Sequence, residues 1–137
     1  MFYNCYSLES LQLDNFNTLK VENMQGIFYN YSSLISLNLD SFDTINDINM
    51  EYMFKDCKKL QSLEIINFVS NTILTMTQMF YNCISLISLD LYNFNIEKLK
   101  LYSYSPNLAF ESINPNIIYC INISRVEDIT IIIYWYF

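Results

Sequence analysis

A 26-residue repeat is the feature of this sequence that most limits how the chain can fold. The string MFYNC occurs at residues 1–5 and again at 79–83, a separation of 78 residues or three times 26. On this period the chain divides into four segments that align in many columns: 1–26, 27–52, 53–78 and 79–104. Such self-similarity indicates units that cannot bury their apolar face alone and become stable by stacking.

The repeat carries the pattern L-x-S-L-x-L, whose last three residues alternate between apolar and polar. This alternation is typical of a short strand with one buried face. We therefore expect strands at the same place in every repeat. The inward leucine columns are Leu8, Leu34, Leu60 and Leu86; Leu11, Leu37, Leu63 and Leu89; and Leu13, Leu39, Ile65 and Leu91.

A second pattern places apolar residues three, four and seven positions after a methionine. It appears as Met24–Ile27–Phe28–Tyr31 and recurs one repeat later from Met50 and again from Met76. These offsets lie on one face of a helix of about two turns. The residues before the methionines, Asn23, Asn49 and Thr75, are good N-caps. The predicted fold class is an α/β repeat, a short leucine-rich repeat solenoid with a parallel sheet on the concave side and short helices on the convex side.

The segments MFYNCYSLESLQLDNFNT and MFYNCISLISLDLYNFNI resemble the BspA-like leucine-rich repeat, a bacterial-type surface-protein repeat of about 26 residues. The resemblance covers residues 1–104, about three quarters of the chain. It implies a non-catalytic surface or secreted protein that mediates adhesion or protein–protein recognition. The sequence departs from the pattern at Tyr31, which replaces Cys, and at Ile66 and Tyr92, which replace Asp.

Residues between the inward leucines should point to the concave surface and form a recognition strip for a protein partner. The strip is polar and acidic, with an apolar spot at one end; its alternative is a solvated sheet face with no ligand. Its residues are Ser10, Gln12, Asp14, Ser36, Asn38, Asp40, Ser62, Glu64, Ile66, Ser88, Asp90 and Tyr92. Adjacent acidic residues of neighbouring strands would repel each other unless a cation or a partner lies between them.

Cys57 and Cys83 occupy one column, so stacking brings them within reach of a disulfide. The alternative, which we favour, is a column of small buried hydrophobic residues, because Tyr31 occupies the same column. Asn30 and Asn122 head N-glycosylation sequons. The cluster Lys55, Lys58 and Lys59 is interpreted as a solvated face.

Several classes of function are not supported. A net charge of −7 argues against a nucleic-acid partner. The chain contains no His and no CxxC pair, and no loop of oxygen ligands defines a calcium site, so we predict no metal and no cofactor. Glu64 and Asp90 are the closest approach to an acid/base pair, but a flat sheet face would not separate their pKa values, so we predict no enzyme.

The segment 105–137 should form an irregular C-terminal cap or tail. Ile118, Ile121 and Ile123 repeat the leucine spacing, but 32 residues after the fourth repeat. A β-hairpin or an added strand is favoured, with a remnant of a membrane anchor or disorder as alternatives. No apolar run reaches the ~20 residues that span a bilayer; the longest, ITIIIYWYF, covers 129–137.

No secretory signal precedes the first repeat, and Met1 stands in the methionine column of Met53 and Met79. We interpret the chain as a fragment of a longer array or a sequence started at an internal Met, with an open edge at 8–13 that permits edge-to-edge self-association. The expected location is the cell surface or the secreted fraction, with the cytoplasm as the alternative. The alternative functions are a structural or vestigial segment of an array and an intracellular scaffold.

Overall fold

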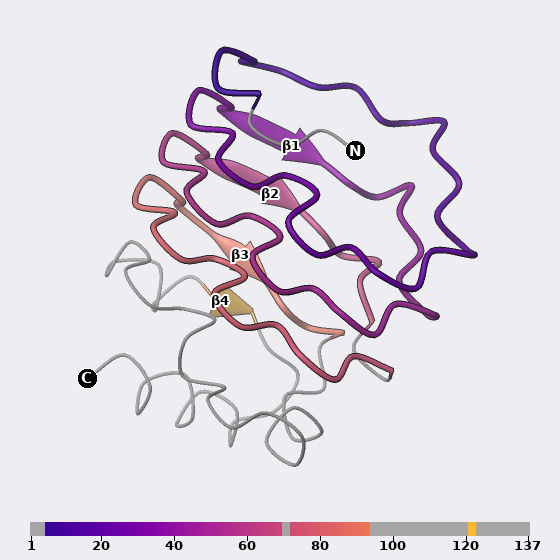
Figure 1. Cartoon of the computed structure of the whole chain (residues 1–137). Coiled ribbons are helices and arrows are strands. Elements are labelled where there is room, and N and C mark those ends of the chain that lie inside the picture. Colours follow the sequence, from indigo (N-terminus) through magenta and orange to yellow (C-terminus); the bar gives the residue numbers. More distant parts are fainter. Residues whose placement is uncertain (1–4, 70–71, 94–120, 123–137) are drawn as a thin grey trace.

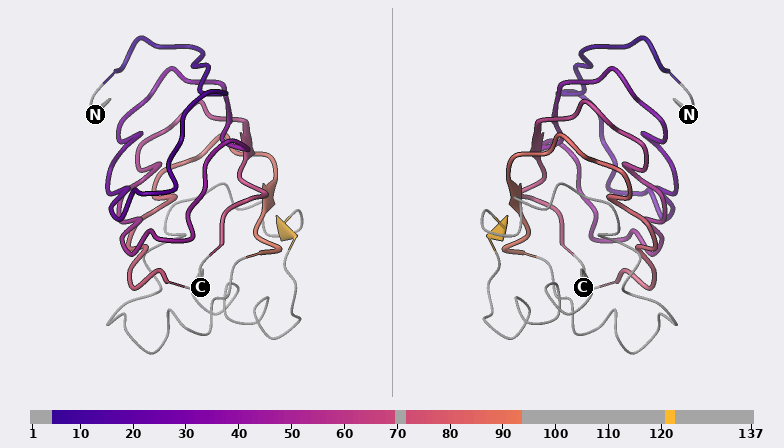
Figure 2. Two further views of the ribbon diagram at one scale, coloured as in Figure 1. Left: turned by 90° about the vertical axis from the view of Figure 1, so that its right-hand side faces the viewer. Right: turned by 90° about the vertical axis from the view of Figure 1, so that its left-hand side faces the viewer.

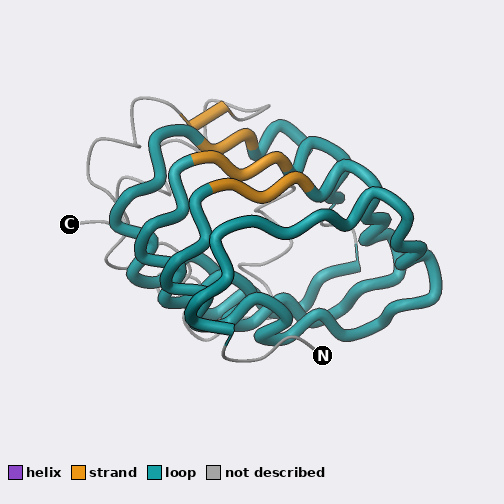
Figure 3. Tube along the Cα trace, turned by 90° about the horizontal axis from the view of Figure 1, so that it is seen from above, coloured by secondary structure: helices purple, strands orange, loops and turns teal. Residues whose placement is uncertain are grey.

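The computed structural model describes residues 5–69, 72–93 and 121–122. The chain winds through successive turns that lie on one another, with the strands in a row along one side of the stack (Figure 1). Seen from above, each turn surrounds a common interior (Figure 3). The views from the two sides show the same layering of the turns (Figure 2).

The strands are short and parallel. β1 (Ser36–Asn38) pairs with β2 (Ser62–Glu64) in the register Ser36↔Ser62, an offset of 26 residues. β3 (Leu89–Asp90) pairs with β4 (Ile121–Asn122) in the register Leu89↔Ile121. The Ile87 N–H donates to the Gln61 carbonyl at 3.1 Å and links the segment before β3 to the one before β2. The 32-residue offset between β3 and β4 is the one seen in the sequence, and it makes 121–122 an added parallel strand. The rest of the predicted cap, including Cys120, lies outside the described residues.

The predicted α/β class is wrong, because no helix occurs among the residues that the structure describes. The segments expected to be helical form successive β-turns instead. Within 50–57, Met53 donates to the Met50 carbonyl at 3.3 Å and Cys57 donates to the Phe54 carbonyl at 3.1 Å. The third residue of each turn has a positive φ, +58° at Tyr52 and +64° at Asp56, as in type II turns.

Backbone hydrogen bonds between neighbouring turns of the chain explain why no helix forms. The N–H groups of Tyr52 and Phe54 donate to the carbonyls of Thr77 and Met79, both at 2.9 Å. The same bonds join Gly26 to Glu51 at 2.9 Å and Phe28 to Met53 at 3.1 Å. A donor that bonds the next turn of the chain is not available for the bond to residue i−4 that defines an α-helix. Every second N–H on this side is used in this way, so the stack replaces helical bonding.

Left-handed residues recur in two columns. One column holds Gly26, Tyr52 and Gln78, and the other holds Asn30, Asp56 and Asn82, with φ between +53° and +64°. Asn and Asp tolerate this conformation because their short side chains bond the local backbone. The chain therefore makes these turns although it contains a single Gly.

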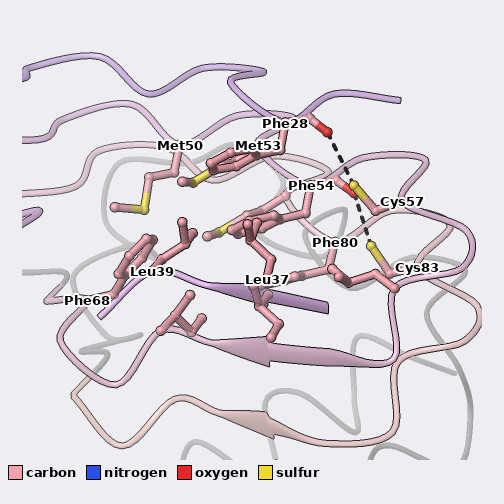
Figure 4. Packing of buried hydrophobic residues seen from close by; sticks show 14 of the residues in the cluster. Phe28, Leu37, Leu39, Met50, Met53, Phe54, Cys57, Phe68, Phe80 and Cys83 are labelled. Atoms are coloured by element: carbon pink, nitrogen blue, oxygen red, sulfur yellow. Dashed lines mark hydrogen bonds between the residues drawn. The ribbon is translucent and has the colours of Figure 1, made fainter. Parts of the chain in front are cut away.

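The core fills the inside of the stack with the repeated apolar columns. Phe28, Phe54 and Phe80 are fully buried, and their rings stack at centroid distances of 5.7 and 5.6 Å. The inward leucines lie opposite these rings and are buried from the second repeat onward (Figure 4). The column positions expected from the sequence to point inward do so.

Buried threonines join the turns between the strands and the β-turns. The Thr44 hydroxyl donates to the Val69 carbonyl at 3.0 Å and accepts the Val69 N–H at 2.9 Å. Thr18 makes the same two bonds with Asp43, at 2.9 and 2.7 Å. Each hydroxyl thus satisfies both backbone groups of a residue in the next turn, where the strand ladder has ended.

Candidate functional site

The strands place the twelve predicted strip residues on one outward surface, which we call the sheet-face strip. Ser36 and Asn38 are exposed on either side of the buried Leu37, and Ser62 and Glu64 are exposed on either side of Leu63. All other members are exposed as well, except Asp90, which is half-buried. The 26-residue register aligns these residues in columns across neighbouring turns.

Two shallow hollows divide the strip. The first, of about 530 Å³, is lined by Ser10, Leu11, Gln12, Asp14, Ser36 and Asn38. The second, of about 510 Å³, lies over β2 and β3 and is lined by Asp40, Ser62, Leu63, Glu64, Ile65, Ile66, Ser88, Leu89 and Asp90. Both are open to solvent and accept protruding groups of a partner better than they would enclose a small molecule.

Asn38 lies between two of the acidic side chains. Its Nδ2 donates to Glu64 Oε2 at 2.7 Å and is 3.5 Å from Asp40 Oδ2. Its Oδ1 accepts the Asp40 N–H at 2.8 Å. One neutral amide therefore orients both carboxylates without neutralising them, and the strip keeps its negative charge. The described residues contain no group of three or more acidic or Cys side chains arranged to hold a metal ion.

The apolar end of the strip is strongly exposed. Ile66 is 52% and Tyr92 is 56% exposed, and the Tyr92 N–H is held by Asp90 Oδ1 at 2.9 Å. The structure adds two exposed residues that the sequence analysis did not select, Ile35 at 45% and Ile87 at 61%. They precede Ser36 and Ser88, and their column alternates apolar and polar residues along the stack. That alternation is the signal in the sequence that could have identified them.

The cysteines lie on the β-turn side, away from the strip. Cys57 and Cys83 are free thiols rather than the disulfide that their shared column made feasible. Cys57 Sγ donates to the Phe28 carbonyl at 3.2 Å, and Cys83 Sγ donates to the Phe54 carbonyl at 3.1 Å (Figure 4). Burial raises the pKa of the Cys57 thiol to about 12 and that of Cys83 well above its usual value. Both are therefore protonated donors at neutral pH and poor nucleophiles.

The remaining predicted residues are dispersed. Asn30 is half-buried in its left-handed turn, and its N–H donates to the Lys55 carbonyl at 2.8 Å. Asn122 belongs to β4, and the structure describes only its backbone. Lys55 Nζ donates to Gln78 Oε1 and lies 4.9 Å from the centre of the Tyr81 ring, whereas Lys58 and Lys59 are exposed. Lys55 is thus held by neighbours and does not join the other two in an open basic site.

In the described part of the chain, no helix has the length and apolar character needed to cross a membrane. A protein-family comparison matches residues 1–130 to the family described as "Mycoplasma protein of unknown function, DUF285". No curated protein and no solved structure matches the chain.

Proposed function

Because the chain belongs to the DUF285 family, we propose that it is a non-catalytic repeat protein, of the BspA-like leucine-rich repeat kind, that recognises a partner protein through its sheet-face strip. The proposed location is the cell surface or the secreted fraction, in keeping with the resemblance of the repeats to surface-protein repeats. The family description states no function, so the proposal depends on the chemistry of the strip.

The observation that carries the proposal is the exposed, aligned composition of the strip. Stacked repeats commonly bind through the surface that their strands form. Here that surface combines acidic side chains, two shallow hollows and an apolar end that includes Tyr92, which is 56% exposed. A tyrosine beside a polar rim is typical of the centre of a protein interface, because its ring offers a large contact area at low entropic cost.

The uncompensated acidic residues favour a basic partner surface. Asp40 and Glu64 share the amide of Asn38, which orients them without supplying positive charge. A cationic patch on a partner would relieve the repulsion between these carboxylates and would speed association at low salt.

The test is binding of the full chain to a panel of purified cell-surface proteins, measured with Asp40→Lys, Tyr92→Ala and the control Lys59→Ala. Both strip variants should lose roughly tenfold or more in affinity, because each removes a central contact. Lys59 is exposed outside the strip, so its replacement should leave affinity unchanged. Folded strip variants that bind as the wild type does would contradict the proposal and favour a spacer or scaffold role.

A further inference from the structure

The first turn of the chain presents an apolar end face that has no equivalent inside the stack. We call this surface the N-terminal end face; its residues are Cys5, Leu8, Leu11, Phe16, Val21 and Ile27. Phe16 is 38% exposed, whereas Phe42 in the same column is 2% exposed. Leu8 and Leu11 are half-buried, whereas Leu34 is fully buried and Leu37 is 2% exposed.

Position in the stack causes this difference, because the residue types are nearly the same. Leu34 and Leu37 are buried because the first turn lies against them, and nothing described lies against Leu8 and Leu11 in the same way. Apolar surface of this extent on a folded protein marks an interaction site. The end face therefore requires an occupant that buries it as one turn buries the next.

The backbone edge of the first turn points to the same need. The N–H groups of Ile35 and Ile48 donate to the carbonyls of Glu9 and Glu22, at 3.2 and 3.1 Å, in the preceding turn. Gln61 and Leu74 repeat these bonds one turn later, at 2.8 and 3.0 Å. The N–H groups of Glu9 and Glu22 stand in the same columns, and no earlier turn among the described residues offers them a carbonyl. An open edge of this kind is a template for pairing with another chain.

We propose that the N-terminal end face binds the same face of a second copy of this chain and forms a two-fold dimer. Two copies of one apolar face are complementary in chemistry, because neither carries a charged group among its six residues. Two-fold pairing uses the same patch on both partners and closes after two chains. The sheet-face strip lies along the side of the stack and stays open to another partner, so the dimer is independent of the proposed function.

The test is the molar mass of the full chain in solution, measured by sedimentation equilibrium over a range of protein concentrations. The wild type should approach twice the chain mass of 16.3 kDa. Phe16→Asp should halve the observed mass, because it places a charge in the middle of the apolar contact. Tyr92→Asp is the matched control, since it introduces the same charge at an exposed aromatic residue of the strip, and it should remain dimeric.

A second variant keeps the test decisive if Phe16→Asp fails to give the circular dichroism spectrum of the folded wild type. Glu9→Pro removes only the N–H at the edge and leaves the Glu9 carbonyl free to accept its bond from Ile35. A folded Glu9→Pro monomer supports the dimer. A wild type that stays monomeric at every concentration, or folded Phe16→Asp and Glu9→Pro variants that stay dimeric, would overturn it.

Discussion

At the scale of the residue, Asp47 is the most unusual feature of the core. It is fully buried in a column that holds Val21 and Ile73 in the neighbouring turns. Its Oδ1 accepts the Asn49 N–H at 3.0 Å, whereas its Oδ2 has no hydrogen bond among the described residues. Burial raises the pKa of this carboxyl from 3.8 to about 6, and backbone hydrogen bonds from Asn49, Met24 and Ile48 only partly oppose the shift.

Asp47 should make the protein less stable as the pH rises. The folded state holds the proton more tightly than the unfolded state, so the stabilising, protonated form is fully present below the unfolded pKa and is lost as the pH rises through about 6. A difference of about two pKa units corresponds to a loss of at most about 3 kcal/mol in the free energy of unfolding.

The variant Asp47→Asn keeps an oxygen for the Asn49 N–H but cannot ionise. We expect the stability difference between variant and wild type to shift in favour of the variant by up to about 3 kcal/mol between about pH 4 and about pH 8. Urea denaturation at the two pH values measures it. A difference that does not change with pH would show that Asp47 is not responsible.

At the scale of the element, the β-turn segment explains why a helix was predicted and not found. Residues 24, 27, 28 and 31 share one face of a helix, but two consecutive β-turns also bring these positions to one side. The sequence pattern therefore predicts which side chains are buried and does not distinguish the two backbones. Asn49 was predicted as a helix cap, and its Oδ1 does accept the N–H two residues later, from Glu51 at 2.9 Å, but in a turn. The deciding interaction is the bond to the next turn of the chain, which no local pattern encodes.

The phenylalanine stack should be the main source of stability in this element. Phe54 is fully buried and lies between Phe28 and Phe80. Replacing it with Ala removes two stacked contacts and opens a cavity, so Phe54→Ala should lower the free energy of unfolding by about 3–5 kcal/mol. Tyr92→Ala, at an exposed ring, should cost less than about 1 kcal/mol. Chemical denaturation of both variants measures the difference, and equal losses would contradict the role of the stack.

At the scale of the whole molecule, one offset organises every side of the stack. The strand register is 26 residues, and hydrogen bonds from Asn38 to Glu64 and from Asn82 to Asp56 span the same distance. The sequence could predict this period, the inward columns and the outward strip, because each recurs in the composition of successive repeats. It could not predict that Asp47 is buried in place of an aliphatic residue or that Ile35 and Ile87 are exposed beside the strip. Those properties depend on contacts between turns.

The most direct test of this account is the register between neighbouring strands. Paired parallel strands lie about 4.8 Å apart, which is within the Cα separation that a disulfide allows. Ser36 and Ser62 are exposed partners in the register, whereas Ser88 lies one repeat further along. The double variant Ser36→Cys/Ser62→Cys should form an intramolecular disulfide, mapped by mass spectrometry of proteolytic fragments, and Ser36→Cys/Ser88→Cys should not. A disulfide in the second pair, or none in the first, would contradict the stacking of 26-residue turns on which the strip and the end face both depend.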